Sequence, residues 1–186
     1  MNRKVKATLL LTLLGILTML PAGSQAQTNS NVANVALNAV VNQSIAVSVS
    51  AAAVNFNLVP GTGPTGGAPS LTVTTNWSLN PGGGPTMSLY GYFTSAGTAL
   101  ADGGGNSIPS ANVLGSVNGG GAVAFTGTGP FGAAGASLQI YSLGITAANK
   151  TGTRNDTLDM SINLTSLPNL PAGTYTGTLS LQAQAL

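Results

Sequence analysis

The chemistry open to this chain is limited by the side chains that it lacks. Its 186 residues include no histidine, cysteine or glutamate, so its acidic side chains are Asp102, Asp156 and Asp159. A serine nucleophile would therefore lack a histidine base, and zinc sites built from histidine and cysteine are excluded. We predict that the protein is not an enzyme and that it has no catalytic residue, no cofactor and no metal ion.

The three aspartates are the remaining candidates for acid–base chemistry. Glycoside hydrolysis uses two opposed carboxylates. Asp156 and Asp159 differ in strand parity, so their side chains should diverge, with Asp156 at the start of a strand and Asp159 on the solvent face. A calcium site formed by these two side chains and loop carbonyls is the alternative. The Gly-rich stretch that begins at Asp102 has no strand–loop–helix context, so it predicts a plain flexible turn.

Tyrosine side chains are the best candidates for a ligand-binding surface. Tyr90, Tyr92 and Tyr141 would form an aromatic platform for sugar rings if they shared one face of a sheet. The alternative is that they cover a second apolar layer or lie singly on the surface. By the alternation of its neighbours Trp77 belongs to the core, and Tyr175 is placed for a structural tyrosine-corner hydrogen bond near the start of its strand.

These side chains must be positioned by strands. The segment 173–185 alternates strictly between apolar and polar residues, which predicts a strand with one buried face and one solvent face. The other predicted strands are 36–50, as one bent strand or two short ones with a break near Asn42, then 54–58, 70–80, a return strand from Met87 to Phe93, 122–126, 137–145 and 157–164.

The fold class follows from these strands and from the turns between them. After the first 26 residues no window shows a convincing helical period, and Gly/Pro-rich turns separate the strands. We therefore predict an all-β fold, an antiparallel Ig-like β-sandwich. We expect a single domain over 27–186, with a flexible N-terminus at 27–34 and a Gly-rich irregular insertion at 95–121 that holds short strands near Ala99 and Val113.

The N-terminus has the pattern of a targeting segment. Cations precede an apolar run, 7–20, that is short for a membrane span, and small residues at Ser24 and Ala26 fit a cleavage site. We predict a signal peptide at 1–26, cut between Ala26 and Gln27, with a retained membrane anchor as the alternative. The protein is then secreted, or lies at the cell surface or in the periplasm, and its mature chain has no stable membrane span.

Removal of this segment changes the charge of the chain. Residues 27–186 keep two cations, Lys150 and Arg154, against three aspartates, a formal charge of −1. Both cations fall in a polar stretch, 146–155, that we interpret as a solvated loop. No basic patch is left for a nucleic acid or an anionic membrane, so neither is expected as a partner.

Two motifs resemble known families. The layout from Ile45 to Leu79, together with the closing segment from Leu170 to Leu179, resembles bacterial secreted Ig-like domains, including the BACON type. Trp77-Ser-Leu79 is similar to the first motif of WxL cell-wall-binding domains, whose second Trp-x-Leu corresponds here to Leu179-Ser-Leu181, without the aromatic ring. These resemblances imply an Ig-like sandwich and a carbohydrate or peptidoglycan ligand.

A secreted all-β chain with an alternating terminal segment is also similar to pilus and spore-coat-U subunits, which usually carry the cysteines that are absent here. Natural sheets protect their edges with charges, prolines or bulges. The strands predicted at 36–50, 70–80 and 173–185 have no charged residue and no internal proline, so whichever lies at an edge can accept another strand.

This pattern predicts a secreted, non-enzymatic structural or adhesion protein of the cell surface or extracellular matrix. It would associate with itself or with another surface protein by β-augmentation. The alternative is a carbohydrate- or peptidoglycan-binding module that acts on cell-wall or extracellular polysaccharide.

Overall fold

A computed structural model describes residues 29–186 of the chain. The predicted signal peptide and its cleavage site lie outside the described residues. The chain divides into two units, Met1–Val40 and Val41–Leu186. The described part of the first unit, 29–40, contains neither helix nor strand, and its side chains are exposed.

The second unit is built from strands, with one short 3-10 turn and no α-helix among the described residues, which confirms the predicted all-β fold. None of the described helical segments has the length and apolar character needed to cross a membrane. The elements are β1 (Ser44–Val49), β2 (Thr65–Gly66), β3 (Leu71–Ser78), β4 (Thr86–Tyr92), β5 (Leu100–Ala101), β6 (Ser107–Ile108), η1 (Ser110–Asn112), β7 (Val113–Val117), β8 (Val123–Ala124), β9 (Ser137–Gly144), β10 (Thr151–Ile162) and β11 (Ser180–Ala185).

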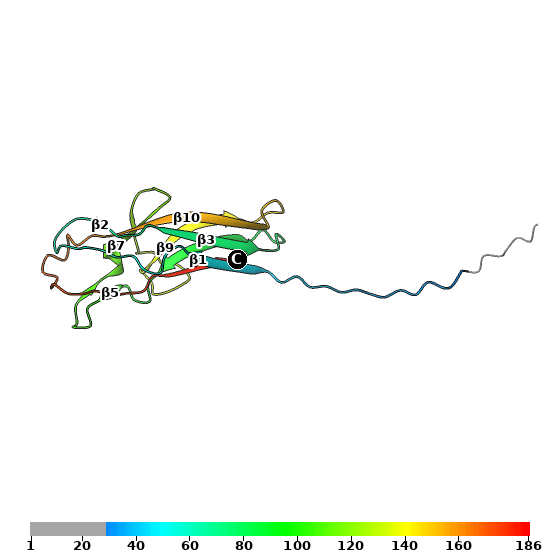
Figure 1. Cartoon of the computed structure of the whole chain (residues 1–186), viewed down its shortest axis with the longest axis horizontal. Helices are drawn as coiled ribbons and strands as arrows, with labels where there is room; N and C mark the ends of the chain where they lie inside the picture. Colours follow the sequence, from blue (N-terminus) through cyan, green and yellow to red (C-terminus); the bar gives the residue numbers. More distant parts are fainter. Residues whose placement is uncertain (1–28) are drawn as a thin grey trace, which may run out of the picture. The chain divides into compact units, whose positions relative to one another are not determined.

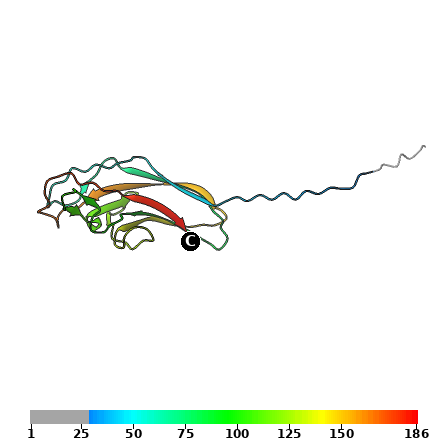
Figure 2. The same ribbon diagram turned by 90° about the horizontal axis from the view of Figure 1, so that it is seen from below.

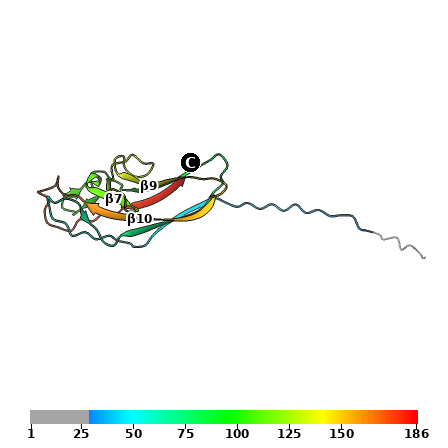
Figure 3. The same ribbon diagram turned by 90° about the horizontal axis from the view of Figure 1, so that it is seen from above.

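Two antiparallel sheets make up the sandwich. The larger has the order β1-β3-β10-β7-β8, with β2 paired to the end of β10, and its first three strands can be followed in Figure 1. The smaller has the order β11-β4-β9, and β5 and β6 form a separate ribbon. Figure 3 shows β7 and β10 in one layer with β9 and β11 in the other.

The core lies between the inner faces of the two sheets. On β3 buried side chains alternate with more exposed ones, and the buried face carries Leu71, Val73, Thr75 and Trp77. This is the alternation that the sequence predicts for 70–80. The indole Nε1 of Trp77 donates to the carbonyl oxygen of Asn149 at 2.8 Å, so the one polar atom of this buried ring is satisfied.

The interpretation of 146–155 as a loop is wrong for its second half. β10 begins at Thr151, pairs with β3 along its first eight residues and lies inside the large sheet. Its inner face begins with Gly152, Arg154 and Asp156, which lie opposite the inward residues of β3. A glycine and two charged residues on a buried face hide the apolar alternation by which a strand is recognised in a sequence.

Three predicted strands are only partly formed. Of 36–50 only β1 is a strand, and of 173–185 only β11. The segment 54–58 contributes a single bridge, from Asn55 to Ala68, and 173–179 likewise contributes one, from Thr176 to Ala101. By contrast, 95–121 contains β5, β6 and β7, and β7 pairs with β10 in the large sheet, so this stretch is an integral part of the sandwich.

Candidate functional site

Two of the three candidate tyrosines lie together. Tyr90 and Tyr92 project from the face of β4 opposite to buried Leu89, and Phe131, from the loop after β8, packs against both. The ring centroids are 6.1 Å apart for Tyr90 and Phe131 and 5.8 Å apart for Tyr92 and Phe131. The hydroxyl of Tyr92 donates to Gln182 of β11 at 3.0 Å. The smaller sheet thus carries a cluster of three half-buried rings.

Tyr141 does not belong to this cluster. It is 6 % exposed, lies opposite Leu89 and points into the core, where the guanidinium carbon of Arg154 lies 4.5 Å from its ring centroid. The register of β9 shifts between Leu89 and Tyr90 of its partner, so Ile140 is an extra residue there. A bulge of this kind reverses the alternation of side chains, and both Ile140 and Tyr141 are buried as a result.

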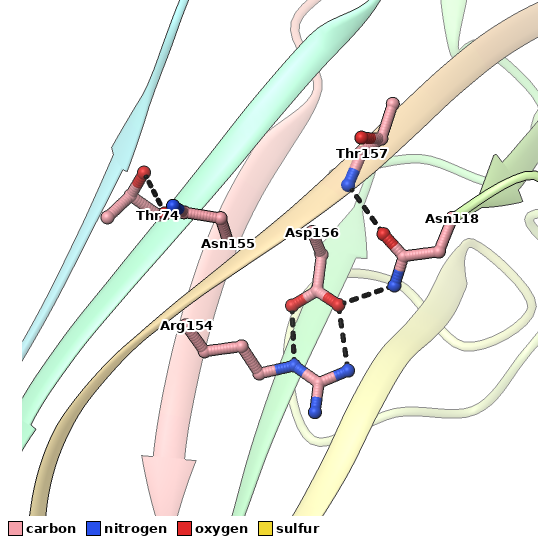
Figure 4. A network of polar contacts seen from close by, with 6 residues as sticks. All are labelled: Thr74, Asn118, Arg154, Asn155, Asp156 and Thr157. Carbon is pink, nitrogen blue, oxygen red and sulfur yellow. Dashed lines mark hydrogen bonds and ion pairs between the residues drawn. The ribbon is translucent and has the colours of Figure 1, made fainter.

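The two charged residues on the inner face of β10 form an ion pair (Figure 4). Arg154 donates to both carboxylate oxygens of Asp156, from Nε and from Nη2, at 2.8 Å each. Asn118, in the turn after β7, donates to the same carboxylate at 2.7 Å and accepts from the backbone amide of Thr157 at 2.8 Å. Asp156 is 1 % exposed, and it lies in the middle of β10 and not at the start of a strand as predicted. The network joins β10 to the turn after β7.

Asp156 is ionised in this network. Its burial opposes ionisation, but the hydrogen bonds from Arg154 and Asn118 and the nearby positive charge outweigh burial and lower its pKa below the usual value. The interpretation of Arg154 as a solvated loop residue is wrong, because its side chain packs on Tyr141 and binds Asp156. Both oxygens of Asp156 are occupied by structural donors.

The other two aspartates serve local structure. Asp159 is exposed, as predicted from its parity, and accepts a hydrogen bond from Ser70. Asp102 accepts from the side chain of Asn106 at 2.7 Å and from two backbone amides of its own turn; the side chain of Asn106 is the main cause of its lowered pKa. Among residues 29–186 no three acidic side chains gather at one point where they could hold a metal ion.

An apolar opening of the described chain lies between the two sheets, beside β1 and β11, which are edge strands; β11 is the red strand in Figure 2. A groove of about 470 Å³ opens there, and its floor is made by core residues that include Phe93, Val113 and Ile162. A second hollow of about 610 Å³ shares Val54, Phe56 and other lining residues with the first. We call the two together the edge groove.

The walls of the edge groove are uncharged. One wall consists of the end of β1 and the segment 51–58, and the other consists of 170–179 and the start of β11. No Asp, Lys or Arg of the described residues lines either hollow. Tyr175 lies in the second wall, and its hydroxyl donates to the carbonyl of Pro171 at 2.9 Å, the structural hydrogen bond expected near the start of this segment.

Both walls have backbone groups without partners. Asn55 exchanges two hydrogen bonds with Ala68, and Thr176 exchanges two with Ala101. In an extended chain successive residues direct their amide and carbonyl groups to opposite sides. Within the described chain the residues that flank them, Val54, Phe56, Tyr175 and Gly177 among them, make no backbone hydrogen bond. Each wall therefore has one paired side and one free side, as an edge strand has.

The edge groove was not predicted, because the alternation in 54–58 and 173–185 is typical of ordinary strands. Comparison with protein-family models, with curated proteins and with solved structures found no match for this chain. The resemblance to BACON-type and WxL domains therefore stays a prediction made from two short motifs.

Proposed function

We propose that this protein is a secreted, non-enzymatic structural or adhesion protein of the cell surface or extracellular matrix. It acts by β-augmentation along the open side of its sandwich, and self-association is one result. The observation that carries the proposal is the edge groove: an uncharged apolar opening between two edge strands, with free backbone groups along both walls.

The distribution of charge supports a role without catalysis. All three carboxylates accept hydrogen bonds from neighbouring residues. Asp156 and Asp159 lie on opposite faces of β10, and Asp102 lies in the turn between β5 and β6. General acid–base catalysis needs a group within hydrogen-bond reach of a bound substrate. The edge groove offers no titratable group other than the hydroxyl of Tyr175, which is bonded to Pro171.

The physical case for strand addition rests on two terms. Each added backbone hydrogen bond contributes a net stabilisation of about 0.5–1.5 kcal/mol. Apolar side chains that enter the groove add about 25 cal/mol per Å² of surface removed from water. Edges that avoid association carry lysine, proline or inward charges, and β1 and β11 carry none of these.

The test is the mass of residues 27–186 in solution over a wide concentration range, with electron microscopy for fibres. We expect mass to rise with concentration. Val49→Lys puts a charge at the end of β1 beside the groove and should lower association, whereas Val123→Lys, at a similarly exposed site on β8, should not. A chain that stays monomeric at every concentration would remove the assembly role.

A second candidate function, binding of carbohydrate or peptidoglycan, is favoured by the cluster of Tyr90, Tyr92 and Phe131. Half-buried aromatic rings on one face are a suitable surface for sugar rings. Retention on insoluble glycans should then fall in Tyr90→Ala and Tyr92→Ala but not in Tyr175→Ala, whose ring lies in the edge groove. If wild type is not retained, or if the first two variants bind as wild type does, this function is excluded.

A further inference from the structure

The segment 33–41 has the composition of a strand but forms none among the described residues. One face of an extended chain here is wholly apolar (Ala33, Val35, Leu37, Ala39 and Val41), and the other face mixes Asn34 and Asn38 with Ala36 and Val40. Val35, Leu37 and Val41 are 81 %, 92 % and 88 % exposed. The segment contains no charge, proline or glycine. Exposed alternating apolar residues of this kind favour pairing with a partner strand.

The edge groove has the hydrogen-bonding groups and the apolar surface that a strand formed by 33–41 needs. Its walls have free backbone groups, its floor is apolar, and neither the groove nor the segment carries a charge. Nine extended residues span about 30 Å at about 3.3 Å per residue. The first wall runs from Val47 to Leu58, twelve residues, so the segment is short enough to lie along it.

The direction of the chain favours a donor from another molecule. The start of β1, at Ser44, lies opposite Ser78, at the end of the sandwich where β11 finishes beside Met87. The groove begins only at Val47 and continues beyond the other end of β1. To reach its own groove, the segment would have to reverse at Asn42-Gln43, and tight reversals of this kind favour glycine.

We propose that residues 33–41 of one molecule bind as a strand in the edge groove of a second copy of this chain. The face formed by Ala33, Val35, Leu37, Ala39 and Val41 lies toward the apolar floor, and the mixed face of Asn34, Ala36, Asn38 and Val40 lies toward solvent. This inference rests on the proposed function and names its donor and acceptor. Because donor and acceptor are different surfaces, a bound pair still has one free groove and one free segment, so the contact propagates into a filament.

The experiment uses residues 27–186 with one change on each side of the contact. Leu37→Asp places a carboxylate on the apolar face of the segment and should weaken association about a hundredfold or more, because an unpaired charge would be buried. Asn38→Asp adds the same charge to the solvent face of the same segment. It should change association by less than about threefold, as surface substitutions do.

Leu179→Asp blocks the groove from the wall, and Ala53→Arg does so from an exposed position where folding does not depend on the side chain. Circular dichroism checks that each variant is folded. A chain with Leu37→Asp keeps its groove, and a chain with a blocked groove keeps its segment. We therefore expect each variant alone to be monomeric and an equal mixture to form a dimer that does not grow.

The outcomes separate this inference from the proposed function. If wild type assembles and Leu37→Asp assembles equally well, the segment is not the donor, although strand-mediated assembly stands. If wild type stays monomeric at all concentrations, both proposals fail. If hydrogen exchange shows that 33–41 are protected in a monomer, the segment fills its own groove, and the second copy is excluded.

Discussion

Replacement of Asp156 by asparagine tests whether the buried ion pair stabilises the sandwich. The carboxylate is 1 % exposed and accepts hydrogen bonds at 2.7–2.8 Å from Arg154 and Asn118. Asparagine keeps the shape but loses the charge and directs an amide donor at one of these donors. Breaking a buried pair costs about 3–5 kcal/mol. The side chain of Arg154 is 37 % exposed and can regain water, so we expect the lower end, about 3 kcal/mol.

The assay is chemical and thermal unfolding, followed by the fluorescence of Trp77, the single and buried tryptophan of the chain. A loss of about 3 kcal/mol corresponds to a fall in Tm of about 6–12 °C for a domain of this size. Asp159→Asn is the matched control. This exposed carboxylate accepts from Ser70, and its replacement should change stability by less than about 0.5 kcal/mol.

The effect of Asp156→Asn should also depend on pH. An aspartate in the unfolded chain has a pKa of about 3.9, and the pKa of folded Asp156 lies below its usual value. The stabilisation by its charge is therefore complete above about pH 5 and is lost as the pH falls through the folded pKa. The difference between wild type and variant should be constant above about pH 5 and shrink below about pH 4. Equal stability at pH 7, or a difference that persists in acid, would refute this reasoning.

Three further predictions concern packing and assembly. Gly152→Ala should cost about 1–3 kcal/mol in unfolding experiments, since the new Cβ would lie 2.6 Å from the ring of Trp77; Gly144→Ala, where no atom lies within 4 Å, is the neutral control. Tyr141→Phe and Thr75→Val each remove a buried hydroxyl that makes no hydrogen bond of normal geometry in the described chain, so neither should lower stability by more than about 0.5 kcal/mol. Association should change little between low and high salt, because groove and segment are uncharged; a steep salt dependence in sedimentation would contradict the edge groove as the contact.

The parts of the fold that were predictable from the sequence share one property. β3 and β4 pack a regular apolar face against the core, and this alternation can be recognised from the sequence alone. The start of β10 was missed because its inner face carries Gly152, Arg154 and Asp156. The pairing of such charges depends on residues far away in the chain, in this case Asn118. A local sequence pattern therefore does not predict this pairing.

The candidate site was predictable only in part, for two different physical reasons. The position of Tyr141 depends on a bulge at Ile140, and one extra residue exchanges the two faces of a strand. Phe131 stands alone in a glycine-rich loop, so no periodicity marks its place beside Tyr90 and Tyr92. Both features depend on the tertiary packing of β9 and the loop before it against β4.

The strands that were predicted but not formed have another explanation. The segments 36–42, 54–58 and 173–179 all have alternation typical of strands, yet none is part of a sheet ladder in the described chain. Two of them form walls of the edge groove, and the third is the exposed apolar segment. Apolar/polar alternation is typical of a strand that buries one face, and the surface that covers this face can belong to the same molecule or to another. If 33–41 of a second copy filled the groove, all three segments would gain the strand partners and the buried face that their sequences predict. The strands that the sequence predicts and the monomer lacks would then form in an intermolecular sheet.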